Sequence, residues 1–196
     1  MGGAVIGAEF FLSGCKSTST QVSDLFDTDN VAFMNEVADT ILPTTAASPG
    51  AKAANVGQFM AVMVRDCYAP GDQKIFLDGL KKLDDASQKQ SGSKYLDLSP
   101  KQRTDLLIAL DKEQKDYYTQ QYKILDADMA KHKGDETYIP ADIPDHYYRM
   151  IKELTLLGYF TSEVGATKAL RYMETPGRYD GCMPYKKGDK AWAIDD

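Results

Sequence analysis

Apolar residues recur every three or four positions along most of this chain, and that spacing is typical of amphipathic helices. Strict alternation of apolar and polar residues, the pattern of a half-buried strand, is not sustained anywhere in the sequence. The chain is therefore expected to be all-α, a compact bundle of about five to seven helices with an irregular C-terminal arm. The expected helices span residues 30–42, 56–68, 72–89, 99–129 and 145–158, with a short one within 162–173.

Several residues predict where these helices begin and end. Ser99 is a good N-cap, and Pro100 suits the first helical turn because its missing N–H is not needed there. Pro70 and Gly71 are expected to separate two helices, and Gly158 to end the last long one. The apolar face of the longest helix continues in its second half, which indicates a buried stripe formed by Tyr117, Tyr118, Tyr122, Leu125 and Met129.

The N-terminus predicts export. A short apolar run ends in Leu12-Ser13-Gly14-Cys15, an order similar to a bacterial lipobox, in which the cysteine is lipidated. Two features depart from that pattern: there is no basic region before the run, and Glu9 interrupts it. The alternative is a frayed tail with an incidental cysteine. We expect a signal remnant over residues 1–15, a flexible tether over 16–28 and a single helical domain over 29–196, lipid-anchored to a bacterial membrane in the periplasm.

Lipidation of Cys15 would leave Cys67 and Cys182 as an even pair in an oxidising compartment, where a disulfide between them is one expectation. The alternative is a free thiol, because Cys67 falls on the apolar stripe of a predicted helix, where unpaired buried cysteines are common.

Composition excludes several function classes. The net charge is −6 and the pI about 5.0, so the concentrated basic surface that nucleic acids require is not expected. His132 and His146 have no second histidine or cysteine at ligand spacing, and no glycine-rich nucleotide cradle or nucleophile elbow occurs. We predict no catalytic residue, no metal site and no cofactor in this chain, which favours a binding or assembly protein.

Aromatic residues interleaved with arginine and lysine gather in the C-terminal arm, Gly158 to Trp192. Tyrosine, tryptophan and arginine dominate the energetics of protein interfaces. The arm is thus a predicted partner interface, although its rings could instead pack on the bundle itself. The candidate interface residues are Tyr159, Arg171, Tyr172, Arg178, Tyr179, Tyr185 and Trp192.

The stretch from Thr155 to Ala193, together with the earlier ADTILPTTAASPGAKAANVGQFM, resembles the gluconate 2-dehydrogenase subunit 3 family. The resemblance implies a small helical accessory subunit that carries no cofactor itself. Its expected partners are a large flavoprotein that holds FAD and oxidises a sugar, and a subunit with haem c. Members often carry the export signal, including twin-arginine types, but no twin-arginine occurs here.

The leading hypothesis is a non-catalytic, lipid-anchored accessory subunit that tethers, stabilises or helps export a periplasmic sugar or gluconate dehydrogenase. Two alternatives remain open. A stand-alone sugar-active enzyme would need a cleft with several carboxylates and an aromatic platform. A ligand-binding lipoprotein would need a large apolar pocket inside the bundle.

Overall fold

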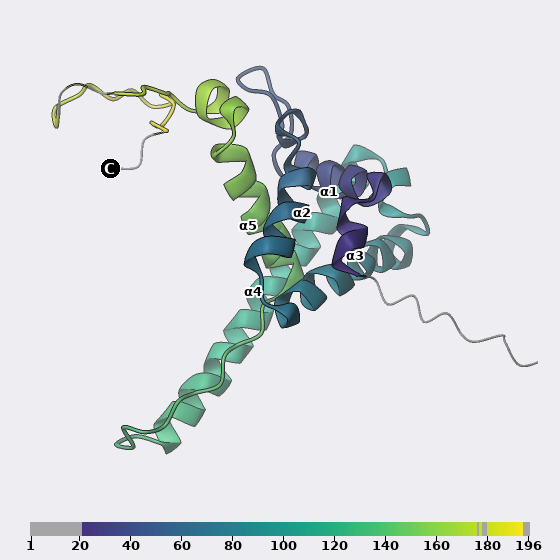
Figure 1. Ribbon diagram of the computed structural model, residues 1–196, viewed down its shortest axis with the longest axis vertical. Helices are drawn as coiled ribbons and strands as arrows, with labels where there is room; N and C mark the ends of the chain where they lie inside the picture. The colour runs from purple at the N-terminus through teal and green to yellow at the C-terminus, as the bar shows by residue number, and fades with distance from the viewer. Residues whose placement is uncertain (1–20, 176, 178–179, 194–196) are drawn as a thin grey trace, which may run out of the picture.

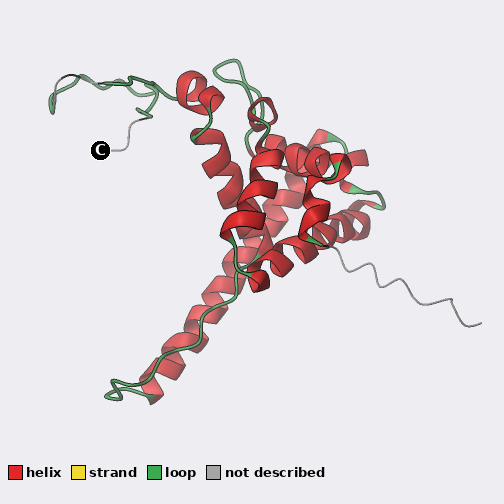
Figure 2. Ribbon diagram, in the orientation of Figure 1, coloured by secondary structure: helices red, strands yellow, loops and turns green. Residues whose placement is uncertain are grey.

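The computed structural model describes residues 21–175, 177 and 180–193, and these residues fold into helices joined by loops (Figure 1, Figure 2). Within them no strand forms beyond one isolated bridge, so the predicted all-α fold is confirmed. The elements are η1 (Val22–Phe26), α1 (Thr28–Ile41), η2 (Ala51–Ala54), α2 (Val56–Cys67), α3 (Pro70–Ser91), η3 (Tyr95–Asp97), α4 (Pro100–Lys131), α5 (Tyr147–Phe160) and η4 (Gly165–Ala169). The last of these is one turn of π-helix, where a short helix was expected.

The core lies where all five α-helices meet. α1 packs against α2, α5 packs against α2 and α3, and the first half of α4 closes the bundle. Each helix turns its apolar stripe inward, and burial of these side chains is the main stabilising term of the fold. The most deeply buried residues include Met34, Val37, Met60, Val64, Phe76, Leu83, Leu106, Met150, Ile151 and Leu154.

Gly158 does not end the last helix, as the sequence predicted; α5 continues to Phe160. A Cβ atom at Gly158 would lie 2.5 Å from Cδ1 of Phe59 on α2. Because that distance is far inside van der Waals contact, the glycine is required for the close approach of the two helices rather than for a turn. The break predicted at Pro70 and Gly71 is present, since α2 ends at Cys67 and α3 begins at Pro70, which fits the preference of proline for the first helical position.

The second half of α4 extends beyond the bundle, and residues 132–146 return alongside it to the start of α5 (Figure 1). The predicted buried stripe on this half is wrong beyond Tyr118, because Tyr122 and Met129 are 51% and 52% exposed. Among the described helices, α5 lines a groove beside Tyr122 but does not bury it. The return segment is attached through Tyr117, whose hydroxyl donates to the carbonyl of Pro144 at 2.8 Å.

The described part of the predicted tether is also structured. Residues 22–26 form η1, which packs against α2 and α3. The apolar side chain of Leu25 is completely buried there. The predicted signal remnant and Cys15 lie outside the described residues.

Candidate partner interface

The C-terminal arm leaves the bundle after α5 and projects away from it (Figure 1). Its distal part is a loop that closes at Arg171 and Trp192. The Arg171 N–H donates to the carbonyl of Ala191 at 2.8 Å, and the Ala193 N–H donates back to the carbonyl of Arg171 at 2.8 Å. The Arg171 guanidinium lies 4.7 Å from the centre of the Trp192 ring. Two predicted interface residues therefore contact each other and hold the loop together.

Tyr159 is not available to a partner. Its side chain is 2% exposed, and its hydroxyl donates to the backbone carbonyl of Pro49. The position follows from helix geometry, since Tyr159 shares a face of α5 with the buried Ile151 and Thr155 at intervals of four residues. The prediction that Tyr159 belongs to the interface is therefore wrong.

Tyr172 and Tyr185 are the predicted interface residues that the structure leaves free to contact a partner, at 56% and 74% exposure. Both lie on the projecting loop, together with the exposed Lys186 and Lys187. Large aromatic rings beside cations suit recognition by a partner protein. Arg178 and Tyr179 lie outside the described residues.

The exposed apolar surface is wider than the aromatic pattern indicated. At the end of α5, Leu157 is 46% exposed and Phe160 is 37% exposed. The end of α5 carries apolar residues on more than one face. This pattern is visible in the sequence, and it was the signal that apolar surface would remain exposed there. Among the described residues, the large exposed apolar side chains of α5 and the arm are Leu156, Leu157, Phe160, Tyr172, Met173, Met183 and Tyr185.

The base of the arm is attached to the bundle by a lysine. Lys190 donates from Nζ to the carbonyl of Ala47, at 3.2 Å, and to that of Lys168. The loop containing Ala47 also accepts the Tyr159 hydrogen bond through Pro49. The arm is therefore attached to the bundle at Lys190, while its loop projects away from the bundle.

Cys67 and Cys182 are both free in the structure, as the free-thiol alternative expected, but Cys67 is exposed rather than buried. Cys67 is the last residue of α2. Its sulfur lies 4.0 Å from that of Met63, while Cys182 sits on the projecting loop of the arm.

The two histidines are separate. His132 stacks on Tyr138 with ring centres 3.8 Å apart, and His146 caps α5 by accepting the Tyr148 N–H at 3.3 Å. In the described part of the chain, no group of three or more histidine, cysteine or acidic side chains could hold a metal ion. No helix among the described residues is long and apolar enough to cross a bilayer.

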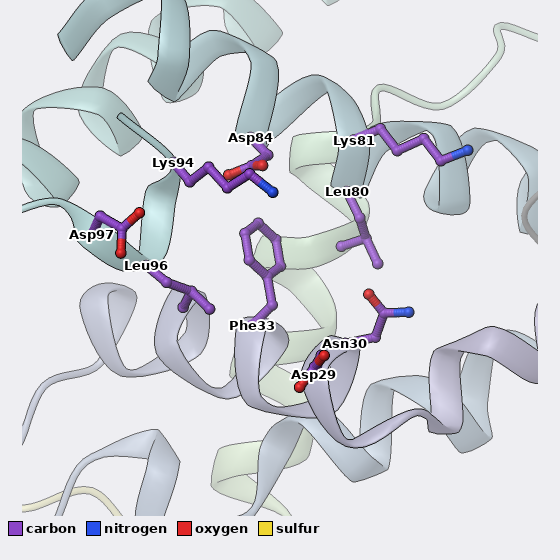
Figure 3. Close-up of a pocket in the computed structure, with 9 residues that line it drawn as sticks. All are labelled: Asp29, Asn30, Phe33, Leu80, Lys81, Asp84, Lys94, Leu96 and Asp97. Atoms are coloured by element: carbon purple, nitrogen blue, oxygen red, sulfur yellow. The ribbon is translucent and has the colours of Figure 1, made fainter. Parts of the chain in front are cut away.

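A shallow groove of about 340 Å³ lies between α1, α3 and η3 (Figure 3). The Phe33 ring stands at its centre, and Asp29, Asp84 and Asp97 lie around it. Asp84 already has a structural role, since its Oδ1 accepts the Tyr95 N–H at 2.8 Å. The groove thus offers an aromatic surface and carboxylates, the combination that the sugar-active alternative requires.

Several carboxylates elsewhere have a lowered pKa. Hydrogen bonds from Lys115 and Lys152 lower the pKa of Asp111 to about 2, and the hydrogen bond from Lys52, together with Arg103, lowers that of Glu36. These neighbours stabilise the ionised carboxylates, whereas a general acid needs a raised pKa. Asp111 and Glu36 therefore act as partners in ion pairs.

Comparison with known proteins gives one family. The model described as gluconate 2-dehydrogenase subunit 3 matches residues 28–177, from the start of α1 to the proximal arm. The match stops before Arg178, so the distal part of the stretch that carried the sequence resemblance lies outside it. Neither the comparison with curated proteins nor that with solved structures gives a match.

Proposed function

Since this chain belongs to the gluconate 2-dehydrogenase subunit 3 family, we propose that it is the non-catalytic accessory subunit of a periplasmic flavin-dependent sugar dehydrogenase. Family membership makes it a component of a multisubunit gluconate dehydrogenase complex. Within that complex it tethers, stabilises or helps export the catalytic subunit. FAD and haem c belong to the partner subunits, and this chain holds neither.

The observation that carries the proposal is the family match across the whole helical bundle. The exposed apolar and aromatic residues of the arm support it, because monomeric proteins rarely leave such residues clustered without a partner. The arm's cations add a complementary feature for an acidic partner surface. Tyr172 and Tyr185 are the contacts assigned to the flavoprotein.

Co-purification tests this function. The tagged full-length chain is isolated from detergent extract of its native cells, and the visible spectrum of the purified material is recorded. Flavin and haem absorbance that travels with the chain, and disappears when the complex is dissociated by salt or denaturant, is the expected result. A chain that purifies alone from cells that contain the active dehydrogenase would contradict the proposal.

The membrane anchor is tested separately. Lipidation of Cys15 supplies a diacylglycerol, whose two acyl chains are enough for stable attachment. Cys15→Ala is expected to move the chain to the soluble periplasmic fraction in cells that lack the flavoprotein. A Cys15→Ala variant that stays in the membrane fraction of such cells would rule the anchor out.

The groove of Figure 3 supports a second candidate, binding of a small polar ligand such as a sugar. Phe33 would provide the stacking surface, and Asp29 and Asp97 would accept hydroxyl hydrogen bonds. Calorimetric titration with glucose and gluconate tests it. Saturable heat that is lost in Phe33→Ala supports this candidate, and no heat at millimolar ligand contradicts it.

A further inference from the structure

A second groove, of about 500 Å³, lies between α4 and α5 and does not involve the arm. Its lining combines aromatic, aliphatic, polar and charged side chains from these two helices. The lining residues are Gln114, Lys115, Tyr118, Thr119, Tyr122, Arg149, Lys152, Glu153 and Leu156.

The apolar part of this groove is accessible. The rings of Tyr118 and Tyr122 lie one helical turn apart on α4, with centres separated by 6.2 Å. Tyr122 is 51% exposed, and Leu156 of α5, which lines the same groove, is 37% exposed. Burial of these two side chains by a partner would remove apolar surface from water, which drives association.

The charged part of the groove has an excess of cations. Lys115, Arg149 and Lys152 line it, against Glu153 as the only lining carboxylate. Asp111 lies beneath the two lysines and accepts from both, at 2.6 Å from Lys115 and 2.5 Å from Lys152. The single carboxylate of Asp111 pairs with the ammonium groups of both Lys115 and Lys152. One positive charge at the groove is therefore not neutralised, in a chain whose net charge is −6.

These cations are already held in position. Arg149 donates to Glu153 at 2.6 Å, and its guanidinium lies 4.6 Å from the centre of the Tyr118 ring. Groups that are ordered before binding lose less conformational entropy when a partner arrives. Arginine and tyrosine in contact at the centre of a groove are also the residue types found at binding hot spots.

The same face of α4 continues well beyond the groove. Ile108, Lys115, Tyr122 and Met129 follow one another at intervals of seven residues and therefore lie along one side of the helix. Ile108 and Met129 are 64% and 52% exposed. At 1.5 Å per residue this row spans about 30 Å. A small anion would fill only the groove, whereas a polypeptide segment can cover the row.

We propose that the α4–α5 groove binds an acidic segment of the catalytic partner, with the segment's carboxylates at Lys115 and Lys152 and its apolar side chains on Tyr122 and Leu156. This inference rests on the proposed function, because it assigns the groove to the flavoprotein. It gives the complex a second contact, separate from the arm.

A pair of double variants on α4 tests the assignment. Lys115→Gln with Tyr122→Ala removes one cation and one apolar contact, and leaves Lys152 to pair with Asp111. The matched control is Lys131→Gln with Ile124→Ala. Ile124 is 62% exposed but lines a different groove, with Leu125 and Ile143. The dissociation constant of each full-length variant is measured with the flavoprotein that co-purifies with the unaltered chain.

The groove variant is expected to bind roughly tenfold more weakly or worse, and the control within about twofold of the unaltered chain. Zero-length carbodiimide cross-linking of the complex should join Lys115 or Lys152 to aspartate or glutamate of the flavoprotein. Equal affinity of the groove variant, or cross-links from these lysines only to Asp111, Glu153 or a second copy of this chain, overturns the groove assignment alone. If no flavoprotein co-purifies with the unaltered chain, the proposed function fails and the groove assignment fails with it.

Discussion

At the scale of single residues, His146 joins the return segment to α5 through a contact that needs its neutral form. Its Nδ1 accepts the Tyr148 N–H, which a protonated nitrogen cannot do, and its Nε2 lies 3.5 Å from Glu113 Oε1. Burial between Tyr117 and Tyr147 lowers the pKa of His146, helped by the positive charge of Lys82 and opposed by Glu113. The neutral imidazole is thus a structural part of the helix N-terminus.

This lowered pKa predicts a pH dependence of stability. As pH falls below about 6.5, the unfolded chain takes up a proton on this histidine before the folded chain does. The contribution of His146 is therefore complete above that pH and is lost as pH falls through the lower pKa of the folded state. We expect the free energy of unfolding in urea to decrease between pH 7.5 and 5.

His146→Asn keeps an N-cap side chain but does not titrate, so part of this decrease should disappear in the variant. His132→Asn is the control, because His132 lies at the exposed end of α4. An identical decrease in the unaltered chain and in His146→Asn would show that other groups cause the pH dependence.

At the scale of elements, glycines decide how closely helices approach. Gly79 on α3 faces Tyr147 on α5, and a Cβ atom at Gly79 would lie 2.3 Å from the Tyr147 Cβ. That Cβ is fixed to the backbone of α5, so rotation of the side chain cannot relieve the clash. The glycine therefore sets the separation of the two helices at this point.

Gly79→Ala is expected to introduce an overpacking cost of about 1–3 kcal/mol, which the gain of about 1 kcal/mol that alanine brings to a helix partly offsets. The free energy of unfolding should therefore fall by up to about 2 kcal/mol. Gly71 is the matched control on the same helix, because a Cβ there meets no atom within 4 Å, so Gly71→Ala should not destabilise. Thermal and urea unfolding measure both variants, and a Gly79→Ala protein as stable as the unaltered chain would contradict the packing.

At the scale of the whole molecule, the exposed large apolar residues gather on two projections. One is α4 with its return segment, which carries Tyr122, Ile124, Met129 and Ile139, and the other is the end of α5 with the arm. The bundle between them turns most of its apolar side chains inward. Exposed apolar residues that gather in this way mark interaction sites on protein surfaces.

The arm offers a test of this arrangement. Tyr185→Ala removes a ring that is 74% exposed and should weaken binding of the flavoprotein by about 2 kcal/mol without a change in melting temperature. Trp192→Ala should also weaken binding, but through loss of the loop closure with Arg171. If both variants bind the partner normally, the arm is not part of the interface; calorimetry and binding titration separate these outcomes.

The sequence by itself determined the helices. Apolar spacing located all five, and Ser99 with Pro100 began α4 as expected, because a cap and a fixed φ are local properties. The residues that carried the family resemblance were also visible without a structure, and the family match now covers residues 28–177.

Only the tertiary structure decided what each stripe faces. Tyr118 and Tyr122 lie on the same predicted stripe, yet the first is buried and the second exposed, because α5 begins beside Tyr118, whose hydroxyl accepts the His146 N–H at 3.0 Å. Tyr159 and Tyr185 are chemically alike, but α5 turns the first into the core while the arm carries the second outward. The α4–α5 groove brings together residues about 40 positions apart, such as Lys115 and Lys152, and the periodicity of one helix holds no information about its neighbour.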